Sequence, residues 1–121
     1  NMINYVNHHG ISFKEVIDCY ESSDLVVFAS FHEGFGMPIV EANAIGRPII
    51  CSNVCSLPEI AGDAALFVDP CSVEEIRNSI NCLINNKRKW DYYVEKGLIN
   101  AKRFNQTNIA DQYIDIYEQI K

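Results

Sequence analysis

Apolar and polar residues follow two periods along the chain, one typical of strands and one typical of helices. Residues 3–7 (INYVN) alternate apolar and polar side chains and predict a short strand. Continuous apolar runs in residues 24–30 (DLVVFAS) and 47–52 (RPIICS) predict strands buried on both faces. Residues 65–69 (ALFVD) predict one more strand after a loop and the short LPEIA turn.

In the segments between these strands, apolar residues recur at helical spacing. Ser12, with Glu15 three residues later, is typical of a capping box and predicts a helix start. Pro38 suits the first turn of a second helix, and Gly46 suits its end. From Ser72 to the end the pattern is helical. The first and third of these helices carry apolar stripes at Phe13, Val16, Ile17 and Tyr20, and at Val73, Ile76, Ile80, Leu83 and Ile84.

Strands that alternate with helices predict an α/β fold. We expect a Rossmann-like, mainly parallel sheet with helices on both faces and further helices at the C-terminal end. The 121 residues suffice for one domain with a core, and the 48% hydrophobic and 21% charged residues are ordinary for a globular protein.

Charge and cysteine content narrow the function classes. The net charge of −6 argues against a domain that binds a phosphate backbone, which usually carries a basic face. No apolar run approaches the roughly 18 residues of a membrane span, and no signal-peptide pattern opens the chain. Five cysteines without a C-x-x-C pair indicate neither a zinc site nor a disulfide framework. We interpret them as reduced cysteines of a cytoplasmic protein.

Residues 31–37 form the loop between the strand that ends near Ser30 and the helix that opens at Pro38. In open α/β sheets, ligands bind in such loops at the carboxyl ends of strands. Gly34 and Gly36 would let a ligand approach the backbone closely. The first N–H groups of a helix favour an anion, so a phosphate suits this position.

Two acids flank the same loop, Glu33 before the helix and Glu41 just inside it. A carboxylate would repel a phosphate, but it only accepts hydrogen bonds and can hold two neighbouring sugar hydroxyls. A ligand with sugars at both ends and phosphate between them fits this pattern. Such a ligand is a nucleotide sugar.

The stretch EGFGMPIVE, in which Glu33 and Glu41 are separated by seven residues, resembles the signature of retaining nucleotide-sugar glycosyltransferases of the GT-B architecture (glycosyl transferases group 1). DLVVFAS resembles the family's strand before the motif, and GRPIICSNVCSLPEIAGDAALFVDP resembles the family's segment after the motif. With the terminal helices, the resemblance covers nearly the whole chain.

The resemblance implies roles by position. Glu33 is the catalytic candidate, facing the donor hexose and its phosphate, and Glu41 would hold the ribose hydroxyls. The loop at residues 52–57 is a weaker candidate for lining the pocket. The family needs no divalent metal and no other cofactor, and no D-x-D pair here argues otherwise. The remaining residues implied in donor binding are Gly34, Phe35, Gly36 and Met37 through their amides, and Val40 by packing.

The resemblance begins only partway through the family's donor domain, whose sheet order is 3-2-1-4-5-6. Residues 3–7 would be strand 3, so residues 1–121 would be a partial C-terminal domain without strands 1 and 2 and without the N-terminal acceptor domain. The basic residues that neutralise the diphosphate would lie in the absent part. We therefore expect no sugar transfer by this chain alone, and self-association through open sheet edges. In the complete enzyme the acceptors would be of the lipid-linked or surface polysaccharide kind, and the site could lie at the inner membrane face.

Other interpretations of the chain remain open. It could be a non-catalytic, Rossmann-like module for nucleotide binding or association, and a receiver-type domain is less favoured because no acid cluster follows the first strand. Both acids could be solvated residues near a helix start. Phe35 could plug the core under the loop, and Arg47 could serve the dipole at its helix end. The histidines His8, His9 and His32 read as loop residues.

Overall fold

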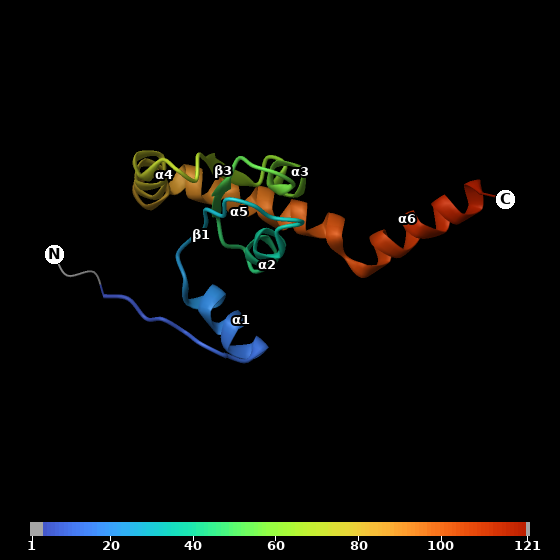
Figure 1. Ribbon diagram of the computed structural model, residues 1–121, viewed down its shortest axis with the longest axis horizontal. Coiled ribbons are helices and arrows are strands. Elements are labelled where there is room, and N and C mark those ends of the chain that lie inside the picture. The colour runs from blue at the N-terminus through green and yellow to red at the C-terminus, as the bar shows by residue number, and fades with distance from the viewer. Residues whose placement is uncertain (1–3, 121) are drawn as a thin grey trace.

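The computed structural model describes residues 4–120, which build a parallel sheet of three strands in the order β1-β2-β3. Figure 1 shows the sheet among its helices. The strands are β1 (Val26–Phe28), β2 (Ile49–Ser52) and β3 (Ala65–Val68). The helices are α1 (Phe13–Ser22), α2 (Met37–Ala44), α3 (Leu57–Ala61), α4 (Val73–Asn85), α5 (Lys87–Ala101), the 3₁₀ turn η1 (Lys102–Phe104) and α6 (Gln106–Gln119).

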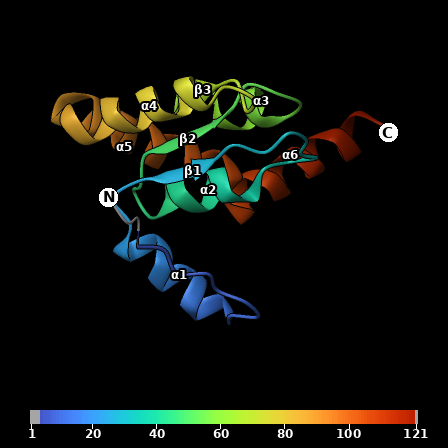
Figure 2. The same cartoon turned by 60° about the vertical axis from the view of Figure 1, so that its left-hand side comes forward.

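Helices cover both faces of the sheet, as the alternating pattern predicted (Figure 2). Successive side chains of a strand point to opposite faces. Ile49 and Cys51 of β2 therefore pack with α2 and α3 in one core cluster, while Ile50 packs with Val68 and Leu83 of α4 in a second. The predicted α/β class with a parallel sheet is confirmed.

Burial differs between the two strands that the sequence predicted to be buried on both faces. All four residues of β2, the central strand, are buried. In β1, Val27 is 41% exposed, so this part of the prediction is wrong. The cause is position, because β1 is an edge strand and α4 packs mainly over β2 and β3.

The N-terminal segment departs from the sequence prediction. Residues 4–7 form no strand, and Ile3 lies outside the described residues. Within the part of the chain that the structure describes, β1 thus pairs with β2 alone and its other edge is open. Whether that edge recruits a second copy stays a prediction.

Helix α1 starts where the capping box placed it. The backbone N–H of Ser12 donates to Glu15 Oε2 at 2.7 Å, and the N–H of Glu15 donates to Ser12 Oγ at 3.3 Å. The helix lies away from the sheet (Figure 1), and none of its residues is fully buried. Its apolar stripe covers part of α2 without forming a closed core, and Phe13 is 75% exposed.

Helix α5 crosses α2 closely at a glycine. A Cβ on Gly97 would lie 2.9 Å from Asn43 Nδ2, so only glycine fits there without a shift. Asn100 donates from Nδ2 to Asn43 Oδ1 at 2.9 Å and to the carbonyl of Ile60 at 3.0 Å. These buried bonds fix α2 against the C-terminal helices, and so fix the helix that carries Glu41.

The C-terminal helices match the predicted helical pattern, although not every residue of the predicted apolar stripe on α4 is buried. On α4, Leu83 is buried and Ile76 and Ile80 pack against the core, but Val73 and Ile84 are mostly exposed. Helix α6 projects from the body (Figure 1), and its residues are exposed. None of the helices in residues 4–120 has both the length and the apolar character needed to cross a membrane.

Candidate functional site

The candidate site lies at the carboxyl edge of the sheet. Residues 29–36 run from the end of β1 to the start of α2, and residues 53–56 leave β2 at the same edge. Parallel strands end on one side, which brings these two loops together. Ser56 joins them, because its Oγ lies 3.2 Å from the carbonyl oxygens of Glu33 and of Phe35 and donates there.

The two glycines of the loop have different structural roles. Gly36 is the N-cap of α2 with φ of +99°, and a Cβ there would lie 2.5 Å from Leu57 Cδ2. The fold therefore requires glycine at position 36 whether or not a ligand binds. Gly34 is exposed, and a Cβ there would meet nothing within 4 Å. Its backbone is the part of the loop that is open to close approach.

Glu33 is half-buried and held by its own loop. Ser30, just after β1, donates from Oγ to Glu33 Oε1 at 3.0 Å. The main-chain oxygen of Glu33 accepts a hydrogen bond from Ser56. One carboxylate oxygen is thus oriented by a hydroxyl, and the backbone is anchored to the neighbouring loop.

Glu41 is also half-buried, and its partner comes from α1. The phenol of Tyr20 donates to Glu41 Oε2 at 2.8 Å. Burial raises the pKa of Tyr20 well above its ordinary value, and the hydrogen bond to Glu41 and the charge of that carboxylate raise it further. Tyr20 is therefore a protonated donor at any physiological pH.

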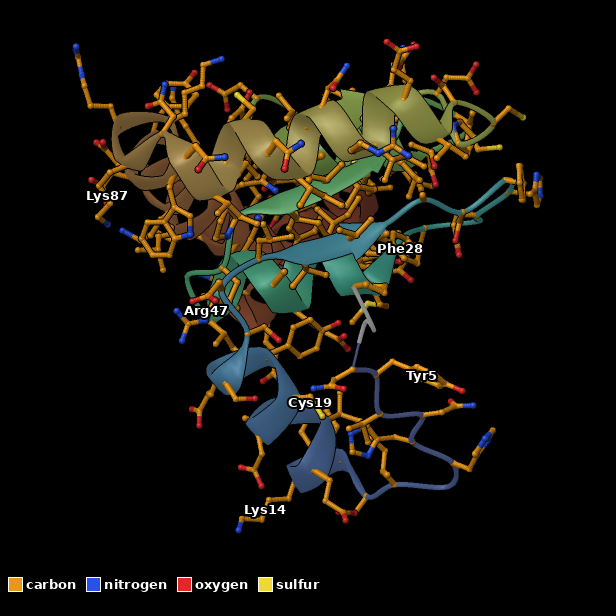
Figure 3. The ribbon with its side chains drawn as sticks, turned by 90° about the vertical axis from the view of Figure 1, so that its left-hand side faces the viewer. Tyr5, Lys14, Cys19, Phe28, Arg47 and Lys87 are labelled. Atoms are coloured by element: carbon orange, nitrogen blue, oxygen red, sulfur yellow. The ribbon has the colours of Figure 1, made fainter. Side chains whose placement is uncertain are left out.

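Arg47 follows α2 in the sequence, but its guanidinium donates to backbone carbonyls of α1. Its Nε donates to the carbonyl of Tyr20 at 3.1 Å, and its Nη2 donates to the carbonyl of Glu21 at 2.6 Å. Figure 3 shows Arg47 between the end of α2 and the last turn of α1. The interpretation that Arg47 complements the dipole of its own helix is wrong, since the guanidinium satisfies the C-terminal carbonyls of the other helix.

The two carboxylates flank one loop–helix unit but have separate surroundings. Glu41 lines a cavity of about 190 Å³ formed with α1, and Glu33 does not line it. Their partners, Tyr20 and Ser30, come from different elements. Glu33 precedes α2 and Glu41 lies within the helix beyond its first turn, and a shared role in one ligand stays a prediction.

The other predicted residues lie around the start of α2. Phe35 is 43% exposed and packs edge-on against Phe104, with ring centroids 5.8 Å apart. It borders a hollow of about 590 Å³ formed with η1 and α6, so the interpretation of Phe35 as a core plug is wrong. Met37 is 53% exposed, and Val40 packs against the core cluster below α2.

The histidines behave as surface residues. His8 and His9 are exposed in a segment without regular structure. His32 is exposed, and its Nδ1 lies 3.3 Å from the Sγ of Cys55 in the neighbouring loop. In the described residues, no group of three or more His, Cys, Asp or Glu side chains is placed to hold a metal ion. That the site needs no metal stays a prediction.

Three residues that orient the acids were missed in the sequence, namely Tyr20, Ser30 and Ser56. A half-buried tyrosine usually finds a partner for its hydroxyl, so Tyr20 on an apolar stripe was a usable signal. Nothing in the sequence shows that the partner is 21 positions away. Ser30 carries no signal beyond its place at the end of a predicted strand, whereas Ser56 lies in the loop at residues 52–57 that the resemblance already named as a weaker candidate.

Comparisons with known proteins agree on one family. Residues 3–99 match the family described as Glycosyl transferases group 1. O-antigen chain mannosyltransferase B of Escherichia coli is 40% identical over 99 residues, which cover 82% of this chain and 26% of that protein. MMP alpha-(1->4)-mannosyltransferase of Mycolicibacterium hassiacum is 31% identical over 114 residues, 91% of this chain and 28% of that protein. The chain thus spans about a quarter of the length of these relatives.

Solved structures show the same fold. Sucrose-phosphate synthase from Thermosynechococcus elongatus superposes with a TM-score of 0.78 at 26% identity, over 91% of this chain and 28% of that one. The C-terminal domain of the glycosyl transferase group 1 family protein LpcC from Francisella tularensis gives a TM-score of 0.69 at 27% identity. The match covers 84% of this chain and 51% of that one. The three-stranded parallel sheet and C-terminal helices match a GT-B C-terminal domain.

Proposed function

The chain belongs to the glycosyl transferases group 1 family, and from this we propose that it supplies the donor-binding part of a glycosyltransferase. In the complete protein, a hexose passes from a nucleotide diphosphate to an acceptor with retention of anomeric configuration. The mannosyltransferase names of the relatives make a mannosyl donor the first to test. Because the name of one relative refers to the O-antigen chain, the acceptor proposed for the complete protein is a polysaccharide.

One observation carries the proposal: Glu33 lies in a loop whose open backbone leads into the first turn of α2, and Glu41 lies in the next turn of the same helix. Gly34 leaves room beside the main chain, and Gly36 has no side chain that could cap the helix. The positive end of the helix dipole then favours a phosphate at this point. In the proposal, the phosphate lies at this helix start and the two hydroxyl-bearing rings lie toward Glu33 and toward Glu41.

Each acid has a defined chemical task in the proposal. Glu33 orients the hexose and stabilises the positive charge that develops as the bond to phosphate breaks. The loop amides bind sugar and phosphate oxygens. Glu41 accepts hydrogen bonds from the ribose hydroxyls, because a carboxylate has room for several donors besides Tyr20.

Kinetics of the complete protein test these tasks. We expect Glu41→Ala to raise the donor dissociation constant, and Glu33→Ala to lower kcat more than Glu41→Ala does. Each change removes hydrogen bonds to a charged group, worth about 1.5–3 kcal/mol. Glu74→Ala is the matched control, since Glu74 is an exposed acid in the first turn of α4 on the other face of the sheet.

Calorimetric titration with uridine and guanosine diphosphate sugars, run beside a product assay, separates a transferase from a plain binding module. A transferase binds one of these donors and forms product. Binding without product in the complete protein, or negligible effects of both acid variants, contradicts the proposal.

A further inference from the structure

Helix α1 is attached to the body by polar contacts and by the half-buried ring of Tyr20, which packs against the first core cluster. None of its residues is fully buried, and the cavity between α1 and α2 has an apolar lining interrupted by one charged residue, Glu41. Tyr20 reaches this carboxylate from α1. A bond from a structural helix to the proposed ribose-binding acid calls for a reason beyond attachment of the helix.

In the Tyr20–Glu41 pair, the two oxygens of the Glu41 carboxylate have different roles. Tyr20 Oη donates to Oε2 of Glu41 at 2.8 Å, a short charge-assisted bond. Accepting this bond fixes the rotation of the carboxylate, while Oε1 keeps its acceptor capacity. An acid oriented before the ligand arrives loses less side-chain entropy on binding.

Tyr20 is itself held at its backbone. Arg47, two residues beyond the end cap of α2, donates to the carbonyls of Tyr20 and Glu21. The segment that carries Glu41 therefore holds the residue that orients Glu41. Neither contact needs a ligand, so the arrangement exists in the free protein.

We propose that Tyr20 is a positioning residue for Glu41, whose free carboxylate oxygen it presents to the ribose hydroxyls of the donor. The inference rests on the proposed function of Glu41. It adds a residue outside the loop and α2, and it assigns α1 a part in donor affinity. Because ribose lies away from the bond that breaks, the effect falls on donor binding and not on the chemical step.

The test is Tyr20→Phe in the complete protein, which removes one hydroxyl and keeps the ring. We expect the donor KM to rise about fivefold, because one hydrogen bond typically changes a binding constant by about that factor. We expect kcat to stay within about twofold of its natural value. Tyr93→Phe is the matched control, because Tyr93 is half-buried against the second core cluster, away from Glu41. The control leaves KM unchanged.

A double variant separates positioning from support of the fold. In a Glu41→Ala background no side-chain oxygen is left for Tyr20 to orient, so we expect Tyr20→Phe to add less than about twofold to KM. If Tyr20→Phe raises KM as much in that background as in the natural one, its role is structural and the inference is overturned.

The same four proteins distinguish failure of the inference from failure of the proposed function. If Glu41→Ala weakens donor binding and Tyr20→Phe does not, the positioning role is wrong and the donor-binding role of Glu41 stands. If Glu41→Ala itself has no effect, the proposed function fails at this residue and the role of Tyr20 fails with it. Thermal unfolding of each variant shows whether α1 remains docked on the body.

Discussion

A Cβ atom on Gly36 would lie 2.5 Å from Cδ2 of Leu57, the first residue of α3. The entrance to α2 is thus packed directly against the helix that follows β2. This contact explains the second glycine of the E-G-F-G stretch without any ligand. The first glycine, Gly34, has no such neighbour.

The two glycines therefore predict opposite outcomes on substitution. Gly36→Ala should lower the free energy of unfolding by about 1–3 kcal/mol, through the clash with Leu57 and the strain of a positive φ. Gly34→Ala should change it by less than about 0.5 kcal/mol, and should weaken donor binding in the complete protein. Denaturant unfolding measures the first quantity. Equal stability of the two variants would show that the loop is packed differently.

The capping box of α1 predicts a pH dependence. Hydrogen bonds from the hydroxyl and the N–H of Ser12 lower the pKa of Glu15 below its ordinary value. The folded-state pKa is then below the unfolded one. The stabilisation of α1 is therefore present above the ordinary glutamate pKa of about 4.3 and is lost as the pH falls through the lowered value.

Titration of Glu15 by carboxyl-carbon NMR checks this directly. Ser12→Ala removes the hydroxyl but keeps the backbone N–H that donates to Glu15, so it should bring the pKa of Glu15 part of the way back toward the ordinary range. Ser22→Ala, a change at the other end of the helix, should leave it unchanged. If the pKa of Glu15 in Ser12→Ala equals that in the natural protein, the hydroxyl of Ser12 is not a cause of its lowering.

Much of the fold could be predicted from local pattern. The capping box, the burial of all of β2 and the place of Pro38 in the first turn of α2 follow from residues close in sequence. Prediction failed where burial depends on distant neighbours. Val27 lies on an apolar strand, yet it is exposed because it points away from α2, and α4 on that other face packs mainly over β2 and β3.

In the candidate site, too, local features could be predicted from the sequence and contacts between distant residues could not. The loop, the helix entrance and both acids could be located from spacing alone. The partners of the acids could not, because Tyr20 meets Glu41 through the docking of α1, and Ser56 meets Glu33 through the register of two strands. The role of Arg47 was misjudged for the same reason, since its acceptors lie 26 and 27 positions away.

The isolated chain should not transfer sugar. In the proposal, the groups that neutralise the diphosphate and the acceptor site come from the part of the relatives' length that this chain does not cover. Without that neutralisation the leaving group is not stabilised. A radiolabel transfer assay with the isolated chain should give no product, with the complete protein as the positive control. Product from the chain alone would show that it carries a whole active site.

The open edge of β1 predicts self-association. Unpaired strand edges present N–H and C=O groups that a second copy can bind. Light scattering of the isolated chain should therefore show an apparent mass that rises with concentration. Replacing Val27, at the middle of this edge strand, by lysine should reduce that rise. A constant monomer mass at high concentration would show that the edge is protected.

The decisive experiment is a structure of the complete protein with an intact nucleotide sugar, and a guanosine diphosphate mannose complex is the first to attempt. We expect an oxygen of Glu41 within about 2.5–3.0 Å of a ribose hydroxyl, and Glu33 beside the hexose, with the phosphates over the amides that follow Gly34. A donor whose sugars touch neither carboxylate would contradict the claim that these acids hold it.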